Sequence, residues 1–237
     1  YGKELSAEAA ARLQEKGVHV TLEWRGAFAE YRRVGGFPVE RVEKVIEGHE
    51  GLKTIVYPVH SIQVEVSAHL LLRLARPVVV APKSKLAFYA KAPVSVGIYV
   101  AEGGSQKLVD SFGPSPYKYV LYGRPASGIV CRFHRTDVFP EPPQAGLEEA
   151  ITKVEVESST DDFVEVRNIV LPLAYASLYV DEHGGAYMEG ARLTVRSDGV
   201  GTVFLENERP LAGLKECVPP PTRFLARTMR FVMEYGL

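Results

Sequence analysis

Apolar and polar residues alternate one by one along most of this 237-residue chain, and this period of two restricts its fold more than any other feature. The segment 18–24 (VHVTLEW) is a clear example, and the segment 62–66 (IQVEV) is another. Successive side chains of a strand point to opposite faces, so the alternation is typical of sheets with one covered and one solvated face. Gly- and Pro-containing segments separate the runs, as hairpin turns require. The sequence therefore predicts an all-β, mainly antiparallel fold.

Helices are expected only near the two ends. Ser6–Lys16 is rich in Ala, Glu and Arg, with Ser6 as a suitable N-cap and Gly17 as a stop. Near the other end, a helix over 222–235 would place its apolar residues on one face. Its other face would carry three cations that are candidates for contact with an anionic partner, with a solvated helix face as the alternative: Arg223, Arg227 and Arg230.

A proline-rich segment divides the chain into two β-patterned halves. Pro140–Gly146 (PEPPQAG) contains three prolines and a glycine, which cannot continue a central strand. We therefore predict two sandwich- or barrel-like domains, an N-terminal one at 1–139 and a C-terminal one at 147–237, joined by a linker at 140–146. The N-terminal domain is expected to have a core of its own.

Composition narrows the setting in which the protein works. The net charge is -1, so no global field attracts nucleic acid or an anionic membrane. Apolar runs are far shorter than the roughly 20 residues that span a bilayer, and the first residues do not resemble a secretory signal. We therefore expect a cytoplasmic protein without membrane insertion. Only two Asn and four Gln are present, a depletion of thermolabile residues that is typical of hyperthermophiles.

The two cysteines, Cys131 and Cys217, are interpreted as buried free thiols. The alternative is a disulfide, because the cytosol of hyperthermophiles is an exception to the rule that cytosolic thiols stay reduced. Cys131 shares its strand parity with Ile129 and Phe133, which predicts that it points into a core and reacts slowly with thiol reagents.

No motif of known catalytic or cofactor-binding spacing occurs in the chain. It lacks a Gly-x-Ser-x-Gly elbow, a His-Glu-x-x-His pair, a Walker A loop and a dinucleotide-binding glycine fingerprint. Cys131 and His134 are three residues apart on a predicted strand, so they face opposite ways and cannot share a metal. His183 stands in an acidic segment that is interpreted as a polar turn, with a weak metal site as the alternative. The sequence therefore predicts no catalytic residue, metal or cofactor.

One predicted hairpin, formed by residues 117–122 and 129–135, carries the candidate binding site. If Tyr122 faces Ile129, one face is apolar, and the other places Tyr119 beside Arg132 and Tyr117 beside His134. Aromatic rings next to guanidinium groups can stack a planar ligand and neutralise phosphate. The alternative is an ordinary solvated sheet face. The candidate ligand-binding residues are Tyr117, Tyr119, Arg124, Arg132, His134 and Arg135.

Several motifs together resemble a known family. They are PVHSIQVEV, RPVVVAPKSKLAFYAKAPVSVGIYV, VDSF, KYVLYG and GIVCRFHRTDVF, which lie between residues 58 and 139. As a set they are similar to an archaeal family of uncharacterised proteins, a domain of unknown function. The resemblance implies an archaeal, cytosolic protein and transfers no activity or catalytic residue.

The absence of a nucleophile–base pair or metal set favours a non-enzymatic binding or accessory module, acting on a protein or an anionic ligand. A first alternative is a single-stranded nucleic-acid binder that uses the Tyr/Arg sheet face, although the net charge does not favour it. A second is an enzyme, for instance a hydrolase, whose site is assembled from residues distant in sequence. A deep pocket with convergent carboxylates or histidines would favour the enzyme.

Overall fold

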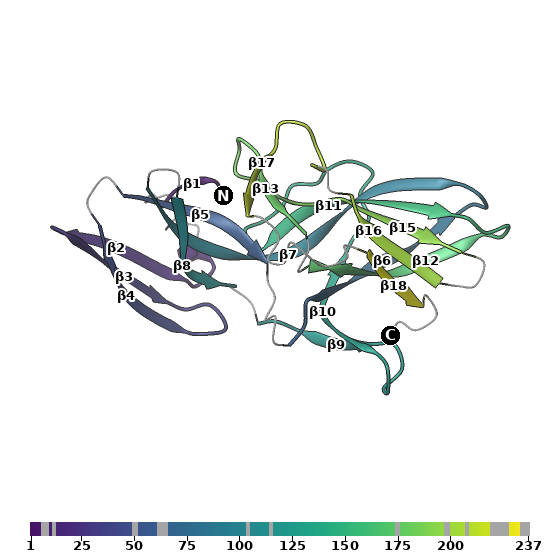
Figure 1. Ribbon diagram of the computed structural model, residues 1–237, viewed down its shortest axis with the longest axis horizontal. Helices are drawn as coiled ribbons and strands as arrows, with labels where there is room; N and C mark the ends of the chain where they lie inside the picture. Colours follow the sequence, from purple (N-terminus) through teal and green to yellow (C-terminus); the bar gives the residue numbers. More distant parts are fainter. Residues whose placement is uncertain are drawn as a thin grey trace.

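The computed structural model describes residues 1–5, 10, 13–48, 52–60, 66–102, 105–113, 116–173, 176–196, 200–206, 209–218 and 228–232. These residues form mainly antiparallel β-strands in three sheets, which confirms the predicted all-β class. None of the sheets closes into a barrel within this described part of the chain. Figure 1 shows an elongated molecule with the smallest sheet at one end.

The three sheets differ greatly in size. The smallest consists of β2 (His19–Arg25), β3 (Phe28–Val34) and β4 (Arg41–Glu47). A four-stranded sheet has the order β12 (Val164–Pro172), β6 (His69–Val80), β10 (Ile129–Thr136) and β9 (Tyr119–Tyr122). The eleven-stranded sheet contains β1 (Lys3–Glu4), β5 (Lys53–His60), β7 (Lys85–Glu102), β8 (Ser105–Phe112), β11 (Glu149–Ser158), β13 (Leu178–Val180), β14 (Ala186–Met188), β15 (Ala191–Val195), β16 (Val200–Leu205), β17 (Lys215–Val218) and β18 (Thr228–Val232).

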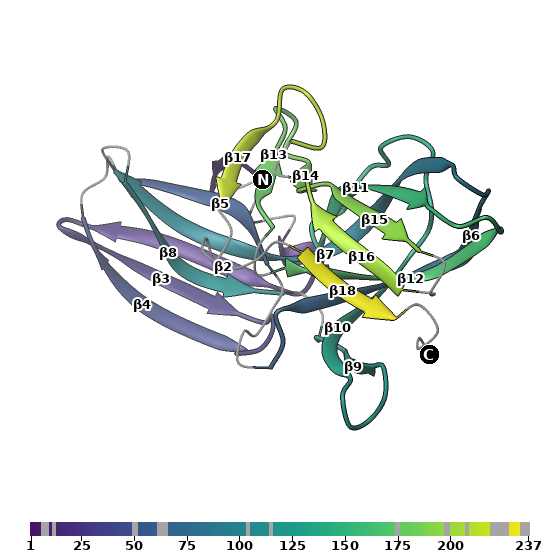
Figure 2. The same cartoon turned by 45° about the vertical axis from the view of Figure 1, so that its right-hand side comes forward.

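Strand β7 is the longest element and runs through both halves of the molecule (Figure 2). Its first part pairs with β11 as far as Pro93, and its second part pairs with β5 from Val94 onward. The strand continues without interruption through Lys91-Ala92-Pro93. Proline is tolerated here because its missing N–H coincides with the point where the pairing partner changes.

A first sandwich forms where β2, β3 and β4 cover the β5–β7–β8 part of the large sheet. Inward-facing residues of both sheets make one cluster, with members such as Val20, Tyr31, Val56, Ile98 and Phe112. The alternation seen in 18–24 is thus the alternation between this core and solvent.

A buried ion pair joins the two sheets of the first sandwich. Arg33 of β3 is 1% exposed, and its Nε donates to Oδ2 of Asp110 of β8 at 2.6 Å. The hydroxyl of Tyr31 donates to the same oxygen at 2.7 Å, and Arg33 Nη1 donates to the Val39 carbonyl at 2.7 Å. Both charges are therefore compensated inside the core, as buried ions require.

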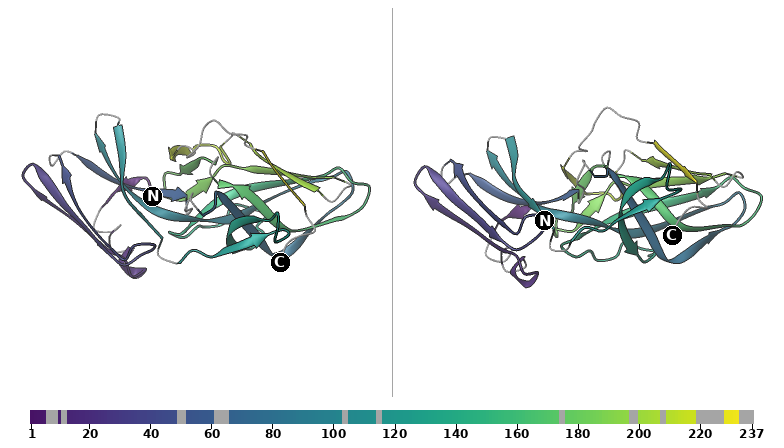
Figure 3. Two further views of the ribbon diagram at one scale, coloured as in Figure 1. Left: turned by 60° about the horizontal axis from the view of Figure 1, so that its bottom comes forward. Right: turned by 90° about the horizontal axis from the view of Figure 1, so that it is seen from below.

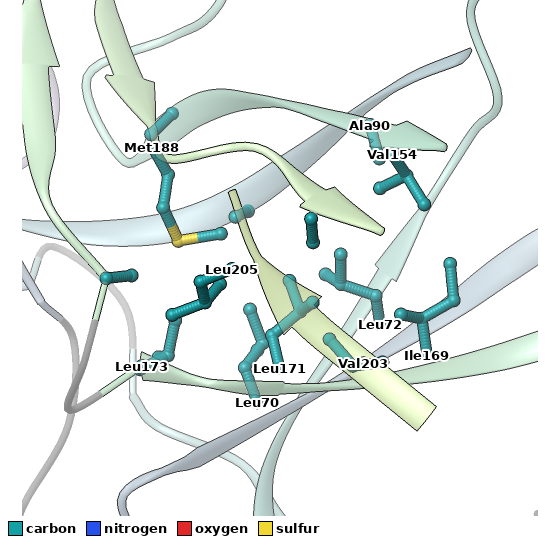
Figure 4. Packing of buried hydrophobic residues seen from close by; sticks show 14 of the residues in the cluster. Leu70, Leu72, Ala90, Val154, Ile169, Leu171, Leu173, Met188, Val203 and Leu205 are labelled. Atoms are coloured by element: carbon teal, nitrogen blue, oxygen red, sulfur yellow. The ribbon is translucent and has the colours of Figure 1, made fainter. Parts of the chain in front are cut away.

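The second sandwich holds the main core, between the four-stranded sheet and the β7–β11–β15–β16 part of the large sheet. Leu70, Leu72, Ile169 and Leu171 from one side meet Val154, Val203 and Leu205 from the other (Figure 4). Close packing of this kind is the main stabilising contribution in an all-β domain.

The pairing of the strands connects the two halves of the chain across residues 140–146. Strands β6 and β7 precede residues 140–146, while β12 and β11 follow them, yet β6 pairs with β12 and β7 with β11. Residues from both halves also share the main cluster. Residues 1–139 therefore supply all the buried members of the first core, but they share the main core with strands that follow residue 146, because a β-sheet recruits its neighbours regardless of their separation in sequence. The segment 140–146 itself has exposed and half-buried residues only.

The predicted C-terminal helix over 222–235 is wrong where it can be examined, because residues 228–232 form β18 and pair with β16. The free edge of β16 offers a ladder of backbone hydrogen bonds, and tertiary pairing overrides local helical preference. Residues 222–227 and 233–235 lie outside the described residues. Of the predicted helix Ser6–Lys16, residues 10 and 13–15 are helical, whereas 6–9 and 11–12 are likewise outside the description.

Both cysteines are free and buried, which confirms the thiol interpretation. Cys131 belongs to the main core cluster together with Tyr122, and burial raises the pKa of its thiol to about 12. No helix in the described ranges is long and apolar enough to cross a membrane. Figure 3 shows the two sandwiches lying end to end along the long axis of the molecule.

Candidate functional site

The predicted hairpin register is confirmed at β9 and β10. Ile129 pairs with Tyr122, Cys131 with Val120, and Arg132 with Tyr119. The ladder ends at this last pair, because β9 begins at Tyr119. Tyr117 therefore has no strand partner, and the predicted pairing of Tyr117 with His134 does not form in the ladder.

The polar face of β10 points into the second sandwich and not toward solvent. Strand β10 runs parallel to β6, where Arg132 pairs with Leu70 and His134 with Leu72. Paired residues share a face of the sheet, and Leu70 and Leu72 point into the core (Figure 4). Thr136, two residues further on, accepts a hydrogen bond on Oγ1 from the backbone N of Lys91 at 2.9 Å. An Arg, a His and a Thr thus occupy positions that a sandwich normally fills with apolar residues.

Arg132 is held between aromatic residues. Its side chain is buried, with the residue 8% exposed, and its guanidinium lies 4.1 Å from the centre of the Tyr117 ring. The Tyr117 hydroxyl is in turn 2.6 Å from Oγ of Ser95 on β7. Burial lowers the pKa of Arg132, but the guanidinium stays charged at neutral pH because its ordinary value is so high. The prediction of an exposed Tyr119–Arg132 platform is therefore wrong, since Arg132 is a buried and already stacked cation.

A cavity of about 470 Å³ opens beside Arg132, at the junction of the two sandwiches. Ligand sites commonly have volumes of about 300–1,000 Å³, so the cavity is large enough for a small molecule. Its lining consists of Lys16, Pro93, Pro116, Lys118, Arg132, Phe133, His134, Arg135, Gly146, Leu147, Glu148 and Glu149.

The charges in the cavity are unequal. Its four lining cations face two carboxylates, and one of these, Glu149, is already bound by Lys91 at 2.8 Å. Burial raises the pKa of Glu149, but hydrogen bonds from Lys91 and the Gly146 N–H outweigh this effect, and the net change is downward. Glu149 is thus ionised at neutral pH, and its charge is compensated within the protein.

His134 is the one histidine in the lining. Burial lowers its pKa, and the nearby charges of Arg132 and Lys91 act in the same direction, whereas Glu149 opposes them. The imidazole is therefore neutral at pH 7, and it can donate one hydrogen bond and accept another.

Only some of the other predicted site residues lie at the cavity. Arg135 is exposed and lines the cavity, and Tyr119 is half-buried beside Arg132. Arg124 lies in the exposed hairpin turn and is not part of the lining. Arg223 and Arg227 lie outside the described residues, and for Arg230 only the strand position in β18 is described, opposite Thr202. The cavity lining thus contains three of the predicted residues, Arg132, His134 and Arg135, while Tyr117 and Tyr119 lie beside Arg132 outside the lining.

Sequence reasoning missed Lys16, Lys118, Glu148 and Glu149. Lys16 and Glu149 are far apart along the chain, and only the junction of the two sandwiches brings them to one cavity. One pattern could have indicated the site: Arg132, His134 and Thr136 share the parity of one strand face, and on the paired strand β6 the positions opposite them are Leu70, Leu72 and Leu74. Within the described ranges, no three His, Cys, Asp or Glu side chains gather to hold a metal ion.

Comparison with known proteins gives a family but no activity. The model of a family described as Protein of unknown function (DUF432) matches residues 1–234. No curated protein and no solved structure matches the chain.

Proposed function

Because the chain belongs to this family of unknown function, whose description assigns no activity, we propose from the geometry that the protein is a binding module for a small anionic ligand. The ligand occupies the cavity at the junction of the two sandwiches. The observation that carries the proposal is the buried Arg132, which points into the space between the sheets next to His134. A buried cation in a lining with surplus positive charge is suited to an anion, because both electrostatics and hydrogen bonding favour one there.

The contacts around Arg132 support a preorganised binding site. Stacking on Tyr117, which is itself anchored to Ser95, fixes the guanidinium before any ligand arrives. A fixed guanidinium loses little conformational freedom on binding, and this increases affinity. Apolar side chains of Pro93, Pro116 and Leu147 complete the walls, so the ligand has an organic body as well as its charge.

The test is calorimetric titration of the protein with a panel of small carboxylates and phosphates, comparing Arg132→Met and Lys118→Met with the parent. Loss of a hydrogen bond to a charged group costs about 1.5–3 kcal/mol, so the dissociation constant should rise roughly 10- to 150-fold in Arg132→Met. Lys118 is exposed, so its replacement keeps the test valid if Arg132→Met folds poorly. Arg167→Met, an exposed cation outside the lining, is the matched control. If no anion binds the parent, or if Arg167→Met weakens binding equally, the proposal fails.

A second candidate function is hydrolysis, which one observation favours: His134, Glu148 and Glu149 converge on the same cavity. A neutral imidazole is the usual general base at neutral pH. If the protein is an enzyme, it converts a ligand that it binds, and His134→Asn abolishes turnover while it leaves binding within a few-fold. Proton and phosphorus NMR of the protein with each bound ligand would detect conversion.

Single-stranded nucleic acid remains the less supported alternative, because Arg132 already stacks on Tyr117 and is buried. Salt-dependent binding of an oligonucleotide that weakens in Tyr119→Ala would favour it. The expected setting, an archaeal and hyperthermophilic cytosol, belongs to the proposal too. It is supported by the scarcity of Asn and Gln, and thermal unfolding above about 90 °C is the expected measurement.

A further inference from the structure

We infer that the anion taken by this cavity is an organic phosphate in its dianionic form, and that cations from both sandwiches hold it. The inference rests on the proposed function and narrows it to one chemical class of ligand.

The lining holds a surplus of three positive charges. Its cations are Lys16, Lys118, Arg132 and Arg135, and its carboxylates are Glu148 and Glu149. Lys91, which is not in the lining, pairs with Glu149 and removes that carboxylate from the balance. Within the described residues, Lys16, Lys118 and Arg135 form no ion pair with the protein. A monoanion would leave most of this charge unbalanced, whereas a dianion balances two thirds of it.

The cations also differ in kind, as phosphate recognition requires. Arg132 is a buried, oriented guanidinium, which can bind two oxygens of one phosphate group side by side. Lys16 and Lys118 are exposed point charges on flexible stems, suited to the outer oxygens of the same group. His134 is neutral and adds a hydrogen-bond donor.

The remaining walls indicate what is attached to the phosphate. Pro93, Pro116, Phe133 and Leu147 contribute apolar surface, and the volume of about 470 Å³ exceeds what inorganic phosphate fills. A ligand with a compact apolar or ring-shaped body uses this surface, because its burial adds to the affinity. The class is therefore a phosphate monoester with a small organic body.

The position of Lys16 gives the site a further property. Lys16 directly follows the helical residues 13–15, whose Leu13 packs in the core of the first sandwich, while Arg132 and Lys118 belong to the β9–β10 region of the second. One phosphate group that contacts all three therefore joins the two sandwiches, which otherwise share β7 as their continuous strand.

The experiment compares three probes by calorimetry at pH 7.5: phenyl phosphate, benzoate and inorganic phosphate. Phenyl phosphate shares its ring with benzoate and its charge with inorganic phosphate, and it is dianionic at this pH because its second pKa is near 6. We expect it to bind about tenfold or more tightly than either of the others. Lys16→Met and Lys118→Met should each weaken the binding of phenyl phosphate several-fold and should weaken the binding of benzoate less. Lys107→Met, an exposed lysine outside the lining, should change neither.

The outcomes separate this inference from the proposal on which it rests. If benzoate binds as tightly as phenyl phosphate and binding depends on Arg132, the cavity is an anion site and the phosphate assignment is overturned. If inorganic phosphate binds as tightly as phenyl phosphate, the inference that the ligand carries an organic body is overturned. If none of the three probes binds the parent protein, both the inference and the anion site are rejected.

Discussion

At the scale of single residues, the buried groups of this protein fall into two kinds. Arg33 and Asp110 compensate each other within the first sandwich, with Tyr31 as a third partner. Arg132 is buried to a similar degree but lies at a cavity and stacks on Tyr117. The first arrangement satisfies its charges within the protein, and the second orients a charge toward a space that a ligand can enter. This difference separates the structural ion pair from Arg132, the residue that we propose as the anion-binding group.

Replacement of Asp110 by Ala is expected to destabilise the fold by about 3–5 kcal/mol, because Arg33 would remain as a buried charge without its counterion. Urea unfolding measures the effect. Glu165→Ala, which breaks the exposed pair with Arg167, should change the free energy of unfolding by less than about 0.5 kcal/mol. An equal loss in both variants would contradict the structural role of the buried pair.

His60 should make the stability of the protein depend on pH. Burial lowers its pKa to about 4, and its Nε2 lies 2.6 Å from the carbonyl of Ala176. Between about pH 4 and 6.5 the unfolded chain binds this proton and the folded chain does not, so the free energy of unfolding rises with pH across that range. The full contribution is on the order of 3 kcal/mol and is present above about pH 6.5. Urea unfolding at several pH values from 4 to 8 measures how the free energy of unfolding changes with pH. This free energy should rise less steeply with pH in His60→Asn than in the parent, and an unchanged pH dependence would exclude His60 as the cause.

At the level of the strands, β7 and β10 are the elements that position the candidate site, because both contribute residues to the cavity lining. Strand β7 supplies the shared wall of both sandwiches, and β10 turns its polar face inward at the place where the main core ends. The apolar face of β10 is buried as well, since Cys131 is 0% exposed. The strand is thus buried on both faces at Cys131 and Arg132, whereas Val130 and Arg135 are exposed.

The close packing around β7 gives a prediction for Gly97. A Cβ atom there would lie 2.6 Å from Cγ1 of Val59 and 2.8 Å from Cε2 of Tyr99, both closer than real contacts. Gly97→Ala should therefore lower the free energy of unfolding by about 1–3 kcal/mol, as overpacked cores do. Gly146→Ala, where the nearest atom is 3.5 Å away, is the matched control and should be close to neutral in the same urea experiment.

The covered face of β10 gives a second prediction. Because the Cys131 thiol is buried and its pKa is raised to about 12, it should react with a thiol reagent at pH 8 far more slowly than in urea-unfolded protein. Cys217→Ser leaves Cys131 as the single thiol and makes the assignment direct. Rapid labelling of the native variant would show that the strand is not covered on this face.

At the scale of the whole molecule, two sandwiches share one long strand, and the chain passes between them more than once. The segment 140–146 leads from β10 to β11, and Phe139, just before it, forms a bridge with Tyr89 of β7. The main core uses residues from before and after this segment. The two halves of the sequence are thus held together by pairing and packing, and not only by their covalent connection.

Limited proteolysis tests this arrangement. Cleavage is expected first within 140–146, because its residues are exposed or half-buried and lie between strands. The two fragments should nevertheless elute together in size-exclusion chromatography and separate only in denaturant. Fragments that separate under native conditions would instead support two independent domains.

Local sequence patterns were enough to predict the class of the fold and the register within its hairpins. Strand periodicity is local, so alternation at 18–24 and the parity of Cys131 and Arg132 could be read directly from neighbouring residues. The pairing of Tyr122 with Ile129 followed from the short turn between them. Even the position of the exposed proline-rich segment was visible, because the three prolines among residues 140–143 remove three of the backbone donors that a central strand needs.

Long-range packing determines which strands become neighbours, and it thereby also determines which residues form the candidate site. Pairing of β7 with β11 and of β6 with β12 depends on how distant segments bury their apolar faces together, which no local pattern encodes. The same pairing turned residues 228–232 into a strand and turned the polar face of β10 from solvent toward the inside. Lys16, Arg132 and Glu149 meet at one cavity because two sandwiches join there, and long-range packing alone brings them together.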